Sequence, residues 1–347
     1  MKTTDKDQML EFIDDFPNQV EKARELASKV KLKGLGGTKR LVLCGVNEAG
    51  IVSEIFQRTV RDIGITVIKD FFFGKTTNKP LVIINSYSGN SEEMISCLRT
   101  ASKFKYPVLG ITSGGFLMET FEKKKIPYIK LPENLPARTT LTLQFFSLLY
   151  VLTNAKIIQD YSKEIQETEN LLKTQKFSRD SYIITKSLGG KMPIIYSGWD
   201  MKPAAYRFKC QLNENAKQLA FANTFPEAMH NELESFRRPN QKIVVVFARD
   251  NSDADTQKYM ELFKRLFDKK LSIVDIRTKG RSLMAKIFTF ILLTDYVSYY
   301  MALMNKVDPS EMELKDSFKK SFSQKKELLG KPEKKYKEVE GTRVGYY

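Results

Sequence analysis

The sequence predicts an α/β protein built from two doubly wound, mostly parallel-sheet domains. Two observations lead to this fold class. Short apolar segments alternate with amphipathic segments of helical periodicity through the first half of the chain, and the same scheme returns in the second half. Short apolar strands that alternate with helices are typical of a parallel sheet covered by helices on both faces. We therefore expect ligands near the carboxyl ends of the strands.

The first half of the chain is predicted to hold five strands and three helices. Each strand is a short apolar run, and each helix carries apolar residues at helical spacing. The strands are expected over residues 40–44, 66–70, 81–85, 108–111 and 128–130, and the helices over residues 50–63, 91–104 and 139–154.

The second half is predicted to repeat this order. A charged periodic stretch, 156–173, is expected to link the halves, and a helix over 309–322 to close the fold. Strands are expected over residues 194–197, 243–248 and 272–276, and helices over residues 202–217, 253–267 and 282–304. The predicted domains are residues 1–155 and 178–322, with a linking helix at 156–177 and a basic tail at 323–347.

Composition indicates a folded protein of the cytoplasm. Hydrophobic residues make up 42% of the chain and aromatic residues 11%, which excludes a disordered protein. The charged N-terminus lacks the apolar core of a secretory signal. The longest apolar runs, 141–152 and 287–293, are too short or too interrupted to span a bilayer. We therefore predict a cytoplasmic protein without a membrane partner.

The cysteines and the single histidine do not predict a metal centre. Cys44, Cys97 and Cys210 are odd in number and lack the paired spacing of a zinc site. Cys44 closes an apolar strand, which favours a buried and inert thiol. We therefore expect no metal, no cofactor and no disulfide framework.

The formal net charge of +16 raises the question of an anionic partner. The lysines are spread along the chain, which is typical of solvated helix faces. The densest run, 319–347, holds nine Lys or Arg residues and four Glu residues, a net charge of +5. Charge alone does not predict nucleic-acid binding, and no helix-turn-helix or aromatic-basic surface is identifiable.

A serine-rich loop lies between a predicted strand and a predicted helix. Residues 84–93 read Ile-Asn-Ser-Tyr-Ser-Gly-Asn-Ser-Glu-Glu, with Ser91 at the expected N-cap. The hydroxyls of Ser86, Ser88 and Ser91 and several backbone N–H groups would meet where the helix dipole is positive, which favours a phosphate. A polar turn with a helix cap explains the same residues, and both interpretations remain open at this point.

His230 is the only histidine, and it lies between Glu227 and Glu232. Imidazole exchanges protons near neutral pH, so a histidine beside carboxylates is a candidate for acid–base chemistry. Glu214 lies 16 residues earlier in a second polar cluster, and Arg138 follows Pro-Ala. Taken singly, these residues would be surface or structural groups. Together they supply a base, an acid and a cation near a developing oxyanion.

These residues carry a resemblance to a known family. Residues 86–93 resemble the signature of sugar isomerase (SIS) domains. The spacing of Glu214 and His230 resembles that of archaeal bifunctional phosphoglucose/phosphomannose isomerases. Segments 205–209, 211–217, 225–227, 230–232, 295–300 and 307–309 also resemble that family. The resemblance covers roughly residues 35–322 and implies two SIS domains.

The resemblance implies an aldose–ketose isomerase that interconverts glucose 6-phosphate, and also mannose 6-phosphate, with fructose 6-phosphate. Glu214 would move a proton between C1 and C2 through an enediol, and His230 would open the sugar ring. Arg138 would stabilise the enediolate charge. Lys319 matches loosely a C-terminal lysine that assists ring opening. This chemistry needs no metal or cofactor.

The resemblance also implies how substrate and subunits are held. The substrate is a small phosphosugar, and the family forms homodimers in which the ring-opening histidine reaches into the neighbour's site. The phosphate would be bound by three hydroxyls, those of Ser86, Ser88 and Ser91.

One loop departs from the family pattern. The first strand of the family normally runs into Gly-x-Gly-Gly-Ser, whereas this chain has Asn47, Glu48 and Ala49 at the last three positions. We expect these side chains to reduce the space for the backbone and to remove a hydroxyl. Glu48 would place a negative charge beside an anionic ligand.

Two further functions compete with isomerisation. The altered loop favours a non-catalytic SIS protein that binds or senses a phosphosugar. The positive charge favours a nucleic-acid-binding protein. The presence of Glu214, His230 and Arg138 separates the enzyme from the sensor, because a sensor does not need a proton-transfer pair.

Overall fold

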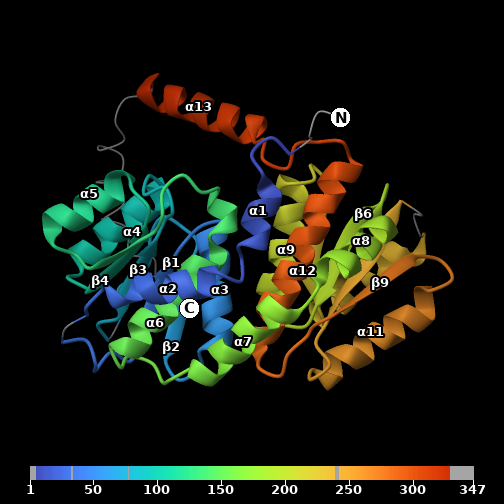
Figure 1. The fold of residues 1–347 in the computed structure, drawn as a ribbon, viewed down its shortest axis with the longest axis horizontal. Helices are drawn as coiled ribbons and strands as arrows, with labels where there is room; N and C mark the ends of the chain where they lie inside the picture. Colours follow the sequence, from blue (N-terminus) through green and yellow to red (C-terminus); the bar gives the residue numbers. More distant parts are fainter. Residues whose placement is uncertain (1–4, 33, 77, 239–241, 329–347) are drawn as a thin grey trace, which may run out of the picture. The chain divides into compact units, whose positions relative to one another are not determined.

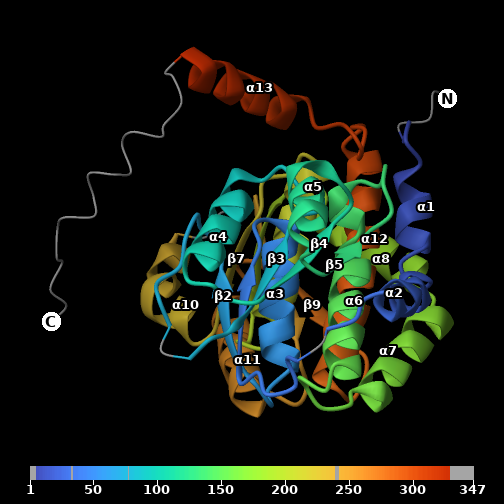
Figure 2. The same ribbon diagram turned by 90° about the vertical axis from the view of Figure 1, so that its left-hand side faces the viewer.

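The computed structural model describes residues 5–32, 34–76, 78–238 and 242–328. The chain divides into two units, residues 1–309 and 310–347. The first unit holds both sheets (Figures 1 and 2). The described part of the second unit contains one helix, α13 (Glu313–Leu328).

Five parallel strands form the first sheet, in the order β2-β1-β3-β4-β5. β1 pairs with both β2 and β3 along its length, so these strands end at one edge. Parallel strands are joined by crossovers, and the loops that follow them therefore gather at that edge. The strands are β1 (Arg40–Cys44), β2 (Gly64–Ile68), β3 (Leu81–Asn85), β4 (Val108–Thr112) and β5 (Tyr128–Lys130).

Alternate strand residues face opposite sides of the first sheet, as the two-residue period of a strand requires. Leu41 and Leu43 join a core that includes α2, α3 and α6, whereas Val42 and Cys44 join a second core with α4 and α5. The sheet is thus covered on both faces. The helices are α2 (Gln19–Ser28), α3 (Glu48–Thr59), α4 (Glu92–Lys103), α5 (Gly115–Lys124) and α6 (Leu141–Asn154).

Four parallel strands form the second sheet, in the order β7-β6-β8-β9. Val244 and Val246 face α8, α9 and α12, whereas Val245 and Phe247 face α11. The strands are β6 (Met192–Ser197), β7 (Phe221–Thr224), β8 (Ile243–Arg249) and β9 (Ser272–Arg277). The helices are α7 (Ser162–Thr174), α8 (Phe177–Leu188), α9 (Lys202–Glu214), α10 (Glu227–Asn231), α11 (Ala254–Phe267) and α12 (Leu283–Met304).

The two sheets share one hydrophobic core. It runs from α3 and α6 through α9 and α12 to the inner face of the second sheet. Phe288 of α12 lies 4.8 Å, ring centre to ring centre, from both Phe145 and Phe146 of α6. Aromatic packing at this distance ties the two halves together. Residues from both halves can therefore be held against each other in fixed positions.

Helix α12 is long and apolar enough to cross a membrane by length and composition alone, with 22 residues. Of its most apolar 18-residue window, 78% is buried inside the protein. It packs against α7, α8 and α9, and it carries the buried polar residues Asp295 and Ser298. It is therefore the central core helix of the unit (Figure 1).

The predicted fold class is confirmed: two parallel sheets, each covered by helices on both faces. The predicted strands over 40–44, 81–85 and 128–130 have the observed bounds. The linking helix begins at Ser162 rather than near 156, because residues 156–161 form the turn after α6. The sequence did not predict α1 (Met9–Asp14), α2, α5, α8, β7, α10 or the 3-10 helix η2 (Leu233–Arg237). The domain boundaries stay a prediction, and most of the basic tail, 329–347, lies outside the described residues.

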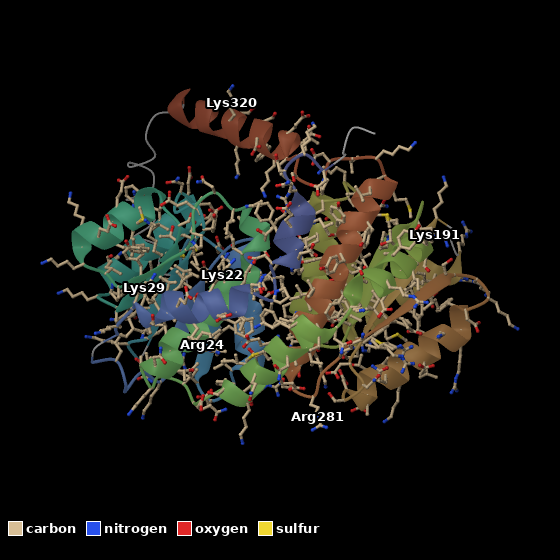
Figure 3. The ribbon with its side chains drawn as sticks, in the orientation of Figure 1. Lys22, Arg24, Lys29, Lys191, Arg281 and Lys320 are labelled. Atoms are coloured by element: carbon tan, nitrogen blue, oxygen red, sulfur yellow. The ribbon has the colours of Figure 1, made fainter. Side chains whose placement is uncertain are left out.

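Positively charged side chains are distributed over both halves of the first unit. Lys22 and Lys29 belong to the α2 region, Lys191 precedes β6, and Arg281 precedes α12 (Figure 3). This spread agrees with solvated helix faces and does not single out one basic surface among the labelled residues.

Candidate active site

The turn after β1 lies at the carboxyl edge of the first sheet. Gly45 and Gly50 pack closely here, because a Cβ on Gly45 would lie 2.6 Å from the Ala49 carbonyl and one on Gly50 would lie 2.8 Å from the Gly45 oxygen. Asn47 has φ 51° and ψ −119°, and α3 begins at Glu48. The turn is therefore tight, and α3 begins within it.

The serine-rich loop follows β3, next to this turn. The Oγ atoms of Ser86 and Ser91 lie 2.7 Å apart, and the Ser88 Oγ accepts a 3.3 Å hydrogen bond from the backbone N–H of Asn90. Ser91 occupies the predicted N-cap of α4 but makes no capping bond to the helix backbone. The predicted N-cap position is therefore confirmed, and the Ser91 hydroxyl bonds Ser86 in place of the helix backbone. The first N–H groups of α4 are left without a side-chain cap, as an anion site requires.

Glycine geometry holds this loop against the start of α5. Gly89 has φ 68°, and a Cβ there would lie 1.8 Å from the carbonyl oxygen of Gly114. Asn90 also accepts a 3.0 Å hydrogen bond from the Phe116 backbone N–H. Only glycine fits at position 89, since the positive φ and the close backbone approach both exclude a side chain. The loop is thus fixed before any ligand binds.

Arg138 lies in a short 3-10 helix, η1 (Ala137–Thr139), and its side chain is buried. Its Nε donates to the Asn215 Oδ1 at 2.8 Å, and one terminal nitrogen donates to the Pro309 oxygen at 2.8 Å. Burial lowers the pKa of the Arg138 guanidinium, an effect that Glu214 and its neighbours oppose. Arg138 is therefore a fixed cation beside Glu214.

Arg207 of α9 bonds two buried carboxylates. It contacts Glu48 closely, and it donates to Asp295 at 2.6 Å and to the Arg138 backbone oxygen at 2.9 Å. Burial would lower the pKa of Arg207, but Asp295 and Glu48 raise it. Burial also raises the pKa of Glu48 to about 8, against the attraction of Arg207.

The position of Glu48 corrects one expectation from the sequence. Its side chain is 6% exposed and faces Arg207, so it does not place an unpaired negative charge beside an anionic ligand. This pairing is not visible in the sequence, because the partners are 159 residues apart.

Glu214 is the last residue of α9 and is half-buried. The Asn47 side-chain amide donates to its Oε1 at 3.4 Å. Its charge also acts on both Arg138 and Glu48. The structure thus brings together Glu214 and Arg138, two of the predicted catalytic residues, beside the turn after β1.

His230 lies elsewhere in the same chain. It is exposed on α10, which follows the carboxyl end of β7, whereas Glu214 precedes the amino end of that strand. β7 has four residues, so about 10 Å of strand separates the two ends. The carboxylates near His230 have local partners: Glu232 accepts from Tyr196 at 2.5 Å, and Glu227 accepts from Asn231 at 3.1 Å.

Lys319 belongs to α13 in the second unit, which is described by itself. Its assistance to ring opening stays a prediction. Among the described residues, no group of three or more His, Cys, Asp or Glu side chains could hold a metal ion.

Asn47, Arg207 and Asp295 lie in the site, but the sequence did not predict a role for any of them. Arg207 and Asp295 were recognised only as parts of motifs. One usable signal was Asp295 itself, a carboxylate in the middle of an otherwise apolar helix. Asn47 was noted only as a departure from a family glycine, and its contact with Glu214 is not visible in sequence.

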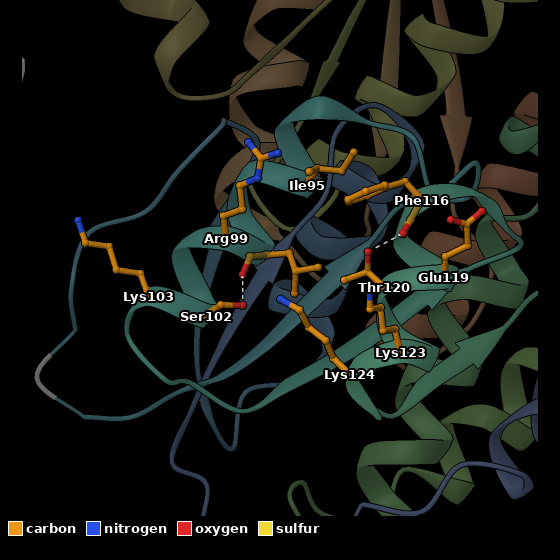
Figure 4. A pocket seen from close by; sticks show the side chains of 10 residues that line it. Ile95, Arg99, Ser102, Lys103, Phe116, Glu119, Thr120, Lys123 and Lys124 are labelled. Carbon is orange, nitrogen blue, oxygen red and sulfur yellow. Dashed lines mark hydrogen bonds between the residues drawn. The ribbon is translucent and has the colours of Figure 1, made fainter. Parts of the chain in front are cut away.

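A groove of about 690 Å³ lies between α4 and α5, away from these residues (Figure 4). Ile95 and Leu98 form apolar parts of its lining, and Arg99, Lys103 and Lys124 add positive charge. None of its lining residues belongs to the candidate site.

Comparison with known proteins agrees with this architecture. Residues 177–322 match the family described as "Bacterial phospho-glucose isomerase C-terminal SIS domain". The tagatose-6-phosphate ketose/aldose isomerase of Escherichia coli has a similar fold, with a TM-score of 0.63 and 15% identity over 87% of this chain and 94% of that one. The C-terminal domain of glucosamine-fructose-6-phosphate aminotransferase from Francisella tularensis gives 0.67 and 15% over 90% and 100%.

Sequence relatives are more specific. A protein of Sulfolobus acidocaldarius named D-glucosamine-6-phosphate 4-epimerase is 31% identical over 65% of this chain and 74% of its own. The bifunctional phosphoglucose/phosphomannose isomerase of Caldicellulosiruptor bescii is 29% identical over 92% of this chain and 100% of its own. That of Thermoplasma volcanium is 30% identical over 83% and 93%. The chain therefore belongs to the bifunctional phosphoglucose/phosphomannose isomerase family, as its motifs predicted.

Proposed function

We propose that this protein is an aldose–ketose isomerase that interconverts glucose 6-phosphate and mannose 6-phosphate with fructose 6-phosphate. The observation that carries the proposal is the pairing of a half-buried carboxylate, Glu214, with a buried guanidinium, Arg138. The α4 N-terminus, which lacks a side-chain cap, follows β3, the strand that pairs with β1. A base, a cation and an anion site are the parts that an enediol mechanism needs. Two relatives of similar length carry that activity in their names.

Each residue of the site has a separate part in the reaction. The phosphate binds at the α4 N-terminus, where Ser86, Ser88 and Ser91 supply hydroxyls. Glu214 removes the proton from C2 of the aldose and returns it to C1. Arg138 is already held by Asn215, so it stabilises the enediolate without reorganising. No step requires a cofactor or a metal.

Ring opening is assigned to His230 of the partner subunit in a homodimer. Glu214 precedes and His230 follows β7, whose ends are about 10 Å apart, and this placement supports the arrangement. In a symmetric dimer the same contact is made twice. Lys319 is proposed to assist ring opening, on the family resemblance alone. The enzyme is proposed to act in the cytoplasm, with no nucleic-acid partner.

Subunit complementation tests the shared site. Glu214→Gln and His230→Ala are each expected to be inactive on cyclic substrate, and mixed subunits unfolded and refolded together should regain activity. Half of the random dimers are mixed, and one of their two sites is intact, so about a quarter of wild-type activity should return. Recovery of no activity, with dimers verified by light scattering, would place both residues in one chain or exclude one of them.

The direct assay is wild-type protein with fructose 6-phosphate, following glucose 6-phosphate and mannose 6-phosphate separately. Formation of either aldose supports the isomerase. Tight binding of a phosphosugar without turnover would favour the sensor function, which the altered loop at residues 47–49 suggests.

A second enzymatic candidate is 4-epimerisation of D-glucosamine 6-phosphate. The relative that carries this name is as similar in identity as the isomerases are, over a shorter span. Incubation with glucosamine 6-phosphate, followed by separation of the C4 epimers, decides between the two. A product epimeric at C4 and no fructose 6-phosphate isomerisation would overturn our proposal.

A further inference from the structure

The turn after β1 contacts the two sides of the candidate site through consecutive residues. The Asn47 amide donates to the Glu214 carboxylate at 3.4 Å. Glu48 bonds Arg207, and Arg207 in turn donates to the backbone oxygen of Arg138 at 2.9 Å. One tight turn is therefore connected both to the proposed base and to the segment that carries the proposed cation.

The backbone at Asn47 is unfavourable for its side chain. Its φ of 51° with ψ of −119° lies where glycine is the normal residue. Such conformations persist where the surroundings hold them, and they concentrate at functional sites. The side chain that occupies this strained position is the one that reaches Glu214.

Glu48 is anchored from several elements at once. Arg207 of α9 faces it directly, and the charges of Asp295 on α12, Glu214 on α9 and Arg138 on η1 act on it as well. Arg207 is also held by Asp295 at 2.6 Å, so it is a fixed link between Glu48 and the Arg138 backbone. Removing the Glu48 carboxyl would leave Arg207 held from one side.

We propose that Asn47 and Glu48 are positioning residues of the isomerase, Asn47 for the Glu214 carboxylate and Glu48, through Arg207, for Arg138. This inference rests on the proposed function. A hydrogen bond donated to a carboxylate oxygen holds that carboxylate in one orientation, so Asn47 positions Glu214 for proton transfer. Glu48 fixes the backbone from which Arg138 extends. Neither residue touches the reacting atoms.

The Asn47 arm is tested with Asn47→Gly and Asn47→Asp. Glycine adopts the native φ without strain and deletes the amide, so kcat should fall about tenfold with KM little changed, while Tm holds or rises. Asn47→Asp keeps the size of the side chain but places a like charge beside the Glu214 carboxylate, so kcat should fall further than in Asn47→Gly, with KM again little changed.

Asn134→Gly is the matched control. Asn134 is exposed and also has a positive φ, 62°, and it is not among the site residues. Its replacement should leave kcat and KM unchanged. An Asn47→Gly enzyme with wild-type kcat, or one whose kcat falls only together with its Tm, would overturn the positioning role of Asn47.

The Glu48 arm relies on rescue by a conservative change. Glu48→Gln keeps an oxygen that accepts from Arg207, and kcat should stay within about twofold of wild type at pH 7. Glu48→Ala removes the contact, and kcat should fall about tenfold or more in protein shown to be folded by circular dichroism. Equal kcat in folded Glu48→Ala and wild type would contradict the positioning role. An inactive wild type would instead reject the proposed function, so the two failures are distinguishable.

Discussion

Both sheets have a strand–loop–helix junction at the carboxyl edge, but the side chains in the two loops differ. In the first sheet, β3 leads into α4 through a loop whose serines bond each other and leave the helix uncapped. In the second, β8 leads into α11 through Asp250 and Asp253, and Asp253 caps the helix by accepting from the Thr256 N–H at 3.0 Å. The same strand–loop–helix unit thus leaves one helix N-terminus without a side-chain cap and caps the other.

A lysine completes the closure of the second junction. Lys286 of α12 donates to the Asp250 Oδ1 at 2.7 Å and to the Ser252 Oγ at 2.6 Å. Burial would raise the pKa of Asp250, but these contacts lower it, so it is ionised at neutral pH. Two carboxylates would repel a phosphate here. We therefore expect a few side chains after each strand, and not the topology, to decide which junction accepts an anion.

The largest expected effect concerns the first sheet, where one substitution should lower kcat and leave KM nearly unchanged. Glu214→Gln keeps the shape of the side chain and deletes the base, so kcat should fall about 10²–10⁴-fold while KM stays nearly unchanged. The measurement is steady-state kinetics on fructose 6-phosphate. Glu119→Gln, on the exposed face of α5, is the control and should have no effect. Substantial turnover in a verified Glu214→Gln protein would exclude Glu214 as the proton carrier.

A substitution at the capped junction between β8 and α11 should lower the free energy of unfolding and leave catalysis unchanged. Lys286→Met leaves Asp250 buried and ionised without its cation, which should lower the free energy of unfolding by about 3–5 kcal/mol. Urea denaturation measures this loss, and KM for the sugar phosphate should be unchanged. Lys264→Met is the control, because Lys264 pairs with Asp275 at a more exposed position and its loss should cost about 1 kcal/mol or less. Similar losses in both variants would remove the distinction between a filled junction and a surface pair.

A smaller effect is expected from the serines of the loop between β3 and α4. Ser86→Ala with Ser88→Ala removes hydroxyls at the α4 N-terminus, and each hydrogen bond to a charged group contributes roughly 1.5–3 kcal/mol. Calorimetric titration with a non-reactive 6-phosphate sugar alcohol should show at least about tenfold weaker binding. Ser252→Ala, at the capped junction, should bind the inhibitor as wild type does. If the double variant also binds normally, the phosphate lies elsewhere.

How far the sequence predicted these features depended on how local each one is. The serine loop and its position between strand and helix were predicted because strand, turn and helix start lie within one short segment. Helix α3 was predicted two residues late, from Gly50, because its first residues, Glu48 and Ala49, lie in a turn shaped by packing and not by periodicity. The pairing of Arg207 with Glu48 and Asp295 joins three distant segments, and only the packed core brings them together.

A titratable group buried in this core should also make stability depend on pH. Burial raises the pKa of Glu48 to about 8, with Arg207 opposing and Glu214 and Asp295 adding to the shift. In the unfolded chain a glutamate titrates near about 4.3. The folded protein therefore holds more protons than the unfolded chain between these values. By linkage, the contribution of Glu48 to stability is complete below the lower pKa and is lost as pH rises through the upper one.

Glu48→Gln removes this titration while keeping the size of the side chain and its contact with Arg207. We expect the unfolding free energy of the variant to rise relative to wild type as pH increases from about 4.3 to about 8, by at most about 1.4 kcal/mol per pH unit. Above that range the difference should level off. Urea unfolding at several pH values measures it, and Glu119→Gln, exposed on α5, should stay parallel to wild type. Parallel curves for Glu48→Gln as well would show that Glu48 is ionised throughout. Its contact with Arg207 would then be a full ion pair at the centre of the site.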